Sequence, residues 1–431
     1  MSETSAAPAA PMTENTFIAV AAGNDDPPPP IKGLRRLMWW IIPANLGVFL
    51  VWGAVPGILL PRQIAVEFGD DQKLAVYTVV ATVGAFAAML AQPIAGQISD
   101  RTRSRFGRRA PWIVLGALAG ALALVGLAFA TSIVGFIIAW TLVQICFNFA
   151  QGPLSAIMPD RVALNRRGTF AALSGIGLMV GAIGGQVIGS FFFHSIALGY
   201  VVFAVIAVVL LTLFTIFNPD HPSTRLPKEP FSLGDFLRTF WVNPVAHPDF
   251  FWAFTGRLLL YTGYFSVTGL QLYLLTDYFH VDEPDRIIPI LGLLSLVGIL
   301  VSTVVSGPLS DRVGRRKPFV FASAAVVSLG FILPWVWPDI TAWFIMTFIA
   351  GFGFGMFQAV DTALMSEVLP SAKSFAKDLG IVNIAATLPQ TLAPGVAGAI
   401  ALAFGYAALF PVAIVLGLLG AFAIWPIKAT R

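Results

Sequence analysis

Long apolar runs separated by short polar stretches make up most of this chain from residue 37 onward. Each run is about 20 residues long, which is the length that an α-helix needs to cross the hydrocarbon core of a bilayer. The pattern therefore predicts an all-α membrane protein with twelve transmembrane helices. We expect them at 38–60, 75–98, 111–130, 133–158, 169–192, 197–217, 251–278, 287–309, 318–337, 341–367, 378–403 and 405–426.

Lysine and arginine are distributed unevenly among the polar stretches. The loops at 101–109 and 312–317 are rich in arginine, whereas those at 61–74 and 280–286 carry mainly aspartate and glutamate. Cytoplasmic loops of membrane proteins are enriched in lysine and arginine. The sequence thus predicts a multi-pass protein of the inner (plasma) membrane with both termini and the linker at 218–250 in the cytoplasm.

The two halves of the chain repeat one another. Gly96-Gln-Ile-Ser-Asp100-Arg101 is matched by Gly307-Pro-Leu-Ser-Asp311-Arg312, and the stretch from Gln151 to Asp160 aligns with the stretch from Gln358 to Glu367. Duplicated halves with a binding site between them are typical of alternating-access transporters. We expect a disordered cytoplasmic tail at 1–36, a six-helix bundle at 37–217, a cytoplasmic linker at 218–250 and a second six-helix bundle at 251–431.

Composition removes the main alternatives to a membrane protein. Charged residues form 11% of the chain and hydrophobic residues 57%, against about 25% charge in soluble domains. The net charge of +4 does not indicate nucleic-acid binding, because the basic residues lie in short loops between apolar runs. Cys146 lies in an apolar run and is interpreted as a packing residue. No nucleotide-binding loop, metal-ligand spacing or nucleophile–base pattern is present, so we expect no cofactor, no metal and no enzyme activity.

These motifs resemble those of a known family. Gly307 to Arg316 reads G-x-L-S-D-R-x-G-R-R, which is similar to the loop signature of the major facilitator superfamily. The longer first copy, Asp100 to Trp112, resembles that of glycoside–pentoside–hexuronide cation symporters and plant sucrose transporters. Asn148-Phe-Ala-Gln151-Gly-Pro is similar to a run in the sucrose carriers. The resemblance implies the major facilitator fold, with the first helix of each three-helix unit lining a central cavity.

The sequence also departs from these patterns. Sucrose carriers have an aspartate seven positions before the residue that matches Gln151, where this chain has Gln144. A proton-coupling acid would therefore lie elsewhere. The glycine series of drug antiporters is only partly present in the fifth helix, because Ala182 and Gln186 replace its final proline and glycine. Close helix packing explains its remaining glycines equally well.

Two charged residues lie deep within predicted spans. Asp361 belongs to the tenth helix and Arg257 to the seventh. A charge near the bilayer centre is costly and usually faces a partner or a cavity. We interpret Asp361 as the proton or cation coupling site and Arg257 as the group that tunes it, with a purely structural ion pair as the alternative. Asp277, near the outer end of the seventh helix, is expected to be served by water or lipid headgroups.

Polar and aromatic residues on the same helices could complete a pocket for a hydroxyl-rich ligand, because amides bind hydroxyls and rings cover apolar faces. Bonds to neighbouring helices are the alternative role for the amides. The candidate substrate-binding residues are Asn45, Trp52, Gln144, Asn148, Gln151, Tyr261, Tyr264, Gln271 and Gln358.

The paired loop motifs are interpreted as conformational gates. In the resembled family, the aspartate and its arginines hold the two halves together on the cytoplasmic side. A purely topogenic loop would explain the arginines but not an aspartate at the same place twice. The candidate gating residues are Asp100, Arg101, Arg108, Arg109, Asp311, Arg312, Arg315 and Arg316.

These observations lead to one expected function and two alternatives. We expect a monomeric secondary active transporter in the lipid bilayer that carries a small-molecule substrate, a sugar, glycoside or similar polyol, together with a proton (or sodium). The first alternative is a proton-coupled exporter of amphipathic drug-like compounds. The second, a receptor or scaffold without transport, is disfavoured because nothing would then offset the burial of the charged pair.

Overall fold

The computed structural model describes residues 33–163, 166–224, 247–313, 316–367 and 375–427. Secondary structure in these ranges consists of helices. The first group comprises α2 (Leu34–Ala54), η1 (Val55–Leu59), α3 (Leu60–Arg101), α4 (Ala110–Leu127), α5 (Ile133–Ser155), α6 (Ile157–Arg161), α7 (Arg167–Ser190) and α8 (Ile196–Phe217). The second comprises α10 (Pro248–Thr268), α11 (Gln271–Tyr273), η3 (Leu274–Tyr278), α12 (Pro284–Val313), α13 (Lys317–Val336), α14 (Ile340–Glu367), α15 (Phe375–Phe404), η5 (Tyr406–Ala408) and α16 (Leu409–Ala423).

These helices make the twelve predicted spans. Nine helical stretches of the described chain are long and apolar enough to cross a membrane, and the first, Leu34–Arg101, joins two predicted spans in one continuous helical run. A bent pair, Pro248–Thr268 with Gln271–Tyr278, makes another span, and the apolar part of α15, Leu392–Phe404, supplies the last. The predicted loop at 61–74 is largely helical, since α3 begins at Leu60 and bends at Gly69, which has φ 69°.

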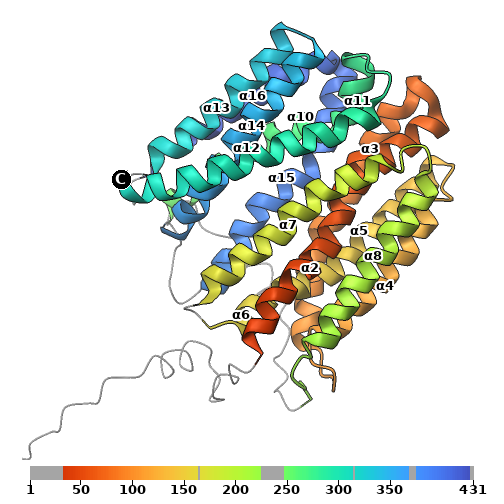
Figure 1. Cartoon of the computed structure of the whole chain (residues 1–431), viewed down its shortest axis with the longest axis vertical. Coiled ribbons are helices and arrows are strands. Elements are labelled where there is room, and N and C mark those ends of the chain that lie inside the picture. Colours follow the sequence, from red (N-terminus) through yellow and green to blue (C-terminus); the bar gives the residue numbers. More distant parts are fainter. Residues whose placement is uncertain (1–32, 164–165, 225–246, 314–315, 368–374, 428–431) are drawn as a thin grey trace, which may run out of the picture.

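The helices form two six-helix bundles. In the first, α2 packs on α7 and α8, and α5 packs on α3 and α4; in the second, α10 packs on α15 and α16, and α14 packs on α12 and α13. The bundles meet where α3 lies along α15 and α7 lies along α12. Figure 1 shows α7 and α12 diverging from the end near η3 toward the end that carries α6. Of the predicted tail and linker, 1–32 and 225–246 lie outside the described residues.

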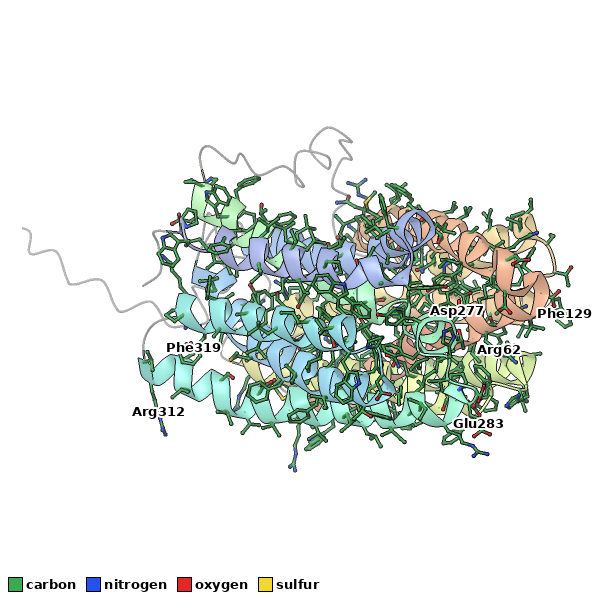
Figure 2. All side chains as sticks on the ribbon, turned by 90° about the horizontal axis from the view of Figure 1, so that it is seen from above. Arg62, Phe129, Asp277, Glu283, Arg312 and Phe319 are labelled. Atoms are coloured by element: carbon green, nitrogen blue, oxygen red, sulfur yellow. The ribbon has the colours of Figure 1, made fainter. Side chains whose placement is uncertain are left out.

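The two ends of the molecule differ in charge. Figure 2 shows Arg62, Asp277 and Glu283 near one end and Arg312 near the other. We call the first the acidic end, and the one that carries the 101–109 loop and Arg312 the arginine-rich end. The bundles approach closely near the acidic end, where a Cβ atom at Gly292 of α12 would lie 3.4 Å from Ile183 and Val187 of α7.

The seventh span is broken rather than continuous. Sequence reasoning predicts one helix at 251–278, but α10 ends at Thr268 and the chain bends by 44° before α11 begins at Gln271. Gly269 lies at the break, where an added Cβ would come within 2.6 Å of the Phe265 carbonyl oxygen and 3.2 Å of Pro394 in α15. Only glycine fits this close approach without a shift of the backbone. The break places Arg257 and Asp277 on separately oriented helical segments.

The glycines of α7 serve helix packing. A Cβ at Gly177 would meet the Ile42 carbonyl oxygen at 2.5 Å, and one at Gly181 would meet Phe49 at 2.7 Å, both in α2. Glycines let two helix backbones approach closely within a membrane. Of the two interpretations of this series, close packing accounts for these positions.

Candidate functional site

The two charges predicted within the spans lie against each other. Arg257 Nε of α10 is 3.3 Å from Asp361 Oδ2 of α14, with the two side chains 9% and 2% exposed. Phe357, Val360 and Leu364 place Asp361 on the buried stripe of α14. Helical residues three and four positions apart share one face, so the apolar pattern around Asp361 directs it into the bundle. The attraction of Arg257 offsets part of the cost of burying this carboxylate.

The ion pair is close but poorly aligned for hydrogen bonding. Among the described residues, neither Arg257 Nε nor Asp361 Oδ2 has a hydrogen-bond partner, although both atoms are buried. A buried polar atom without a partner costs free energy and often marks a site of ligand or proton binding. The geometry therefore leaves Asp361 Oδ2 with capacity to accept a further hydrogen bond or a proton.

Aromatic rings surround this pair on one side. The Arg257 guanidinium lies 5.4 Å from the centre of the Tyr261 ring, and Tyr261 packs on Phe354 and Phe357. Tyr264 stacks on the opposite part of this cluster, 4.3 Å from Phe354 between ring centres. A cation close to an aromatic ring is stabilised by the ring quadrupole. Both predicted tyrosines thus belong to the wall around the ion pair.

The predicted residues of the first bundle form two smaller sets. Trp52 Nε1 of α2 donates to Gln151 Oε1 of α5 over 2.8 Å, and the Trp52 ring meets Trp140 edge to face. Asn148 Nδ2 donates to the Gln144 carbonyl oxygen, one turn earlier in α5, over 2.8 Å. The Trp52–Gln151 bond joins two helices, so this amide already has a packing role.

The other predicted substrate residues have different surroundings. Asn45 Nδ2 donates to the Ile41 carbonyl oxygen of its own helix, and the Asn45 Cβ lies beside Gly177 of α7. Gln271 begins α11 directly after the break and is half-buried, as is Gln358 on α14. The structure thus brings Arg257, Tyr261, Tyr264 and Asp361 into one cluster and leaves these three amides outside its contacts described above.

The first copy of the loop motif forms a dense ion-pair network. Arg109 is 95% buried and binds Asp100 over 2.5 Å and Asp160 over 2.7 Å. Arg108 also binds Asp160, over 2.7 Å. These partners all belong to the first bundle, so in this conformation the motif connects α3, α4 and α6 with one another. Sequence reasoning missed Asp160, although its place opposite Glu367 in the repeat offered a signal.

The start of the linker completes this network. The Arg109 backbone N–H donates to Asp220 Oδ2 over 2.9 Å, and Ser223 Oγ donates to the Thr102 carbonyl oxygen. Burial lowers the pKa of the Arg109 guanidinium, but attraction to Asp160 and Asp100 outweighs it and the net shift is upward. Arg109 therefore remains charged and fixes the fold of this loop.

The remaining gating candidates are less completely described. Arg101 is half-buried at the end of α3, Arg312 is exposed at the end of α12, and Arg316 is half-buried before α13. Arg315 lies outside the described residues, as does the side chain of Asp311.

An ion pair that sequence reasoning missed joins the bundles at the acidic end. Lys73 Nζ of α3 lies 2.7 Å from Asp277 Oδ1 of η3. The expectation that water or headgroups serve Asp277 is wrong, because Lys73, Thr276 and Tyr406 are its partners. Tyr273 Oη also crosses between the bundles and donates to the Pro61 carbonyl oxygen over 2.9 Å. A cavity of about 540 Å³ lies here, lined by Lys73, Asp277, Arg62 and their neighbours.

Comparison with known proteins agrees with this architecture. A family described as "MFS/sugar transport protein" matches residues 72–408. The chain belongs to this family. It is therefore a multi-pass membrane protein of the major facilitator superfamily, and the resemblance drawn from the two loop motifs is confirmed at that level.

Curated relatives from Arabidopsis thaliana match shorter stretches. Sucrose transport protein SUC4 is 29% identical over 178 residues, which are 37% of this chain and 34% of that protein. Monosaccharide-sensing protein 3 is 27% identical over 130 residues, 30% of this chain and 16% of that protein. The matches thus span about a third or less of each relative's own length.

Solved structures show the same fold over nearly the whole chain. A point mutant of the nucleoside transporter NupG has a TM-score of 0.71 at 16% identity, covering 91% of this chain and 99% of that one. The human organic anion transporter MFSD10 (TETRAN) has a TM-score of 0.63 at 15% identity, covering 92% of this chain and 100% of that one. At such low identity the likeness establishes the fold alone.

Proposed function

We propose that this chain is a secondary active transporter that carries a sugar, glycoside or similar polyol together with a proton by alternating access. The observation that carries the proposal is the buried Arg257–Asp361 pair, with Asp361 2% exposed. Intramembrane ionisable residues are rare and commonly form proton relays or ion pathways. Membership of a sugar-transport family and the partial match to a sucrose transport protein favour a hydroxylated substrate.

The proposed coupling uses the unfilled hydrogen-bonding capacity of Asp361. A proton on Oδ2 neutralises the carboxylate and weakens its attraction to Arg257, which frees the guanidinium to bind substrate hydroxyls. Loss of the proton restores the ion pair and displaces the substrate. Proton and substrate binding are then linked by a coupling free energy that each ligand exerts on the other.

The two bundles are proposed to alternate around this pair. The Asp100–Arg109 network stabilises the arginine-rich end of the first bundle in the present conformation. We expect it to exchange contacts with the second bundle when that end closes, because a state-dependent contact is what biases a conformational equilibrium. Gln144, Asn148 and the Trp52–Gln151 pair supply candidate hydroxyl-binding groups from the first bundle.

Transport by purified protein in proteoliposomes tests the proposal. A labelled disaccharide should accumulate when the outside is acidified, and not when an equal sodium gradient replaces the pH gradient. The protonophore-treated vesicle is the control. Accumulation driven by sodium alone would overturn proton coupling. Gradient-driven efflux of a lipophilic dye without sugar uptake would favour the exporter alternative.

The proposed orientation places the arginine-rich end in the cytoplasm, as the distribution of lysine and arginine indicates. The expected result is one-sided labelling of single cysteines in a Cys146→Ala background. Phe106→Cys, at a side chain 60% exposed at the arginine-rich end, should react with an impermeant maleimide only in inverted vesicles. Glu283→Cys, at the acidic end, should react only in intact cells. Labelling of both from the same side would contradict the topology.

A further inference from the structure

Lys73 lies between two carboxylates that belong to different bundles. Its ammonium contacts Asp277 Oδ1 of the second bundle at 2.7 Å and Asp70 Oδ1 of the first at 2.6 Å. The Lys73 side chain is 7% exposed, Asp277 is 20% exposed and Asp70 is 91% exposed. The inter-bundle contact is thus shielded from water, whereas the contact within the first bundle faces solvent.

Asp277 has further partners within its own bundle. Thr276 Oγ1 donates to Asp277 Oδ1, and Tyr406 Oη of η5 donates to Asp277 Oδ2, each over 2.7 Å. Lys73 therefore supplies the only one of these three donors that comes from the first bundle. Separation of the bundles at this end would remove Lys73 from Asp277 and leave the other two donors in place.

We propose that Lys73, Asp277 and Asp70 form a partner-exchange gate at the acidic end. In the closed state Lys73 binds both carboxylates; in the open state it keeps Asp70, while Asp277 keeps Thr276 and Tyr406. The proposal rests on the alternating-access function proposed above. It assigns the gate to residues outside both loop motifs and outside the Arg257–Asp361 pair.

Partner exchange makes the gate reversible. Breaking a shielded ion pair is strongly unfavourable when it strands an uncompensated charge. Here neither charge is stranded, since each retains a partner from its own bundle. Asp70 thus acts in the opposite sense to Asp277: Asp277 stabilises the closed gate, and Asp70 lowers the cost of opening it.

The surroundings provide room for this exchange. The cavity of about 540 Å³ at the acidic end is lined by Asp70, Lys73 and Asp277 together with Thr276. A polar cavity of this size holds water, so separated charges can be hydrated as they part. Neutral contacts close the gate on the inner side, where the Tyr77 and Tyr273 rings meet edge to face at 5.5 Å between centres.

The opposite signs expected for the two carboxylates give a sharp test. Thr78 is buried in α3, and a Cβ at Gly398 of α15 would collide with its side chain. Thr78→Cys, in a Cys146→Ala background, should therefore react with an impermeant maleimide from the acidic side only when the gate opens. Labelling rates are measured without substrate or ion gradient, so the result does not depend on coupled transport.

Asp277→Asn should raise this labelling rate roughly tenfold, because a charged hydrogen bond is lost from the closed state alone. Lys73→Gln should act in the same direction. Asp70→Asn should lower the rate about two- to fivefold, a smaller effect because its ion pair is solvent-exposed. Glu283→Gln is the matched control, since it removes an ion pair with Arg286 at the same end and within one bundle. It should leave the rate unchanged.

Shifts of the same sign for Asp70→Asn and Asp277→Asn would overturn the partner-exchange gate. So would an unchanged rate in Asp277→Asn, or an equal increase in Glu283→Gln. Failure of the proposed function has a different signature, because wild-type vesicles would then show no proton-driven sugar uptake while the labelling pattern of the gate could still be observed. Thermal unfolding of each purified variant in detergent identifies any that is misfolded.

Discussion

Asp361→Asn is expected to abolish gradient-driven accumulation of substrate, by at least tenfold, while exchange of substrate across the membrane persists. The amide keeps the shape of the carboxyl group but cannot take up and release a proton in the working pH range. The variant therefore retains a binding site and loses its coupling ion. The measurement is uptake under an imposed pH gradient, compared with counterflow of labelled substrate in preloaded vesicles.

Arg257→Ala should be more damaging than Asp361→Asn, because it leaves the buried Asp361 without its cationic partner. Removing one member of a buried ion pair costs about 3–5 kcal/mol. The double variant Arg257→Ala/Asp361→Asn should recover stability but not accumulation. Wild-type accumulation by Asp361→Asn would show that the pair is structural and that coupling resides elsewhere.

Arg109→Ala is expected to lower the stability of the first bundle by about 2–3 kcal/mol. This is somewhat less than the loss for a fully buried pair, because Asp160 keeps Arg108 and Asp100 is half exposed. Arg109 is nearly fully buried and joins α3, α4 and α6 through Asp100 and Asp160. The measurement is the midpoint of thermal unfolding in detergent.

Arg108→Ala is the matched control for that experiment. Arg108 is the neighbouring residue and shares the Asp160 carboxylate, but its side chain is 32% exposed. Exposed ion pairs contribute about 1 kcal/mol or less. Equal losses of stability in the two variants would contradict the distinct role assigned to Arg109.

The architecture could be predicted because it follows from regularities of the sequence. Apolar runs of bilayer length determine the helices, and the repeated Asp-Arg motifs indicate the duplication. Asp361 and Arg257 could be singled out because charge is so rare within the spans. Their contact was then the simplest way to reduce the cost of burying both.

The acidic-end gate could not be predicted in the same way. Lys73 and Asp277 are separated by 204 residues, and each lies close to a loop where charged residues are ordinary. Only the tertiary packing of α3 against α11 and η3 brings them together. The bend at Gly269 was missed for a similar reason, because the close approach of Pro394 that requires glycine comes from another helix.

That bend also makes the seventh span a lever. Its long arm, α10, carries Arg257, and its short arm carries Asp277 eight residues beyond Gly269. At 1.5 Å of rise per residue, the short arm is about 12 Å long. A rotation of about 10° at the fulcrum would move Asp277 by about 2 Å, enough to part it from the Lys73 ammonium. A small reorientation at the centre of the membrane could thus be transmitted to its surface by one helix.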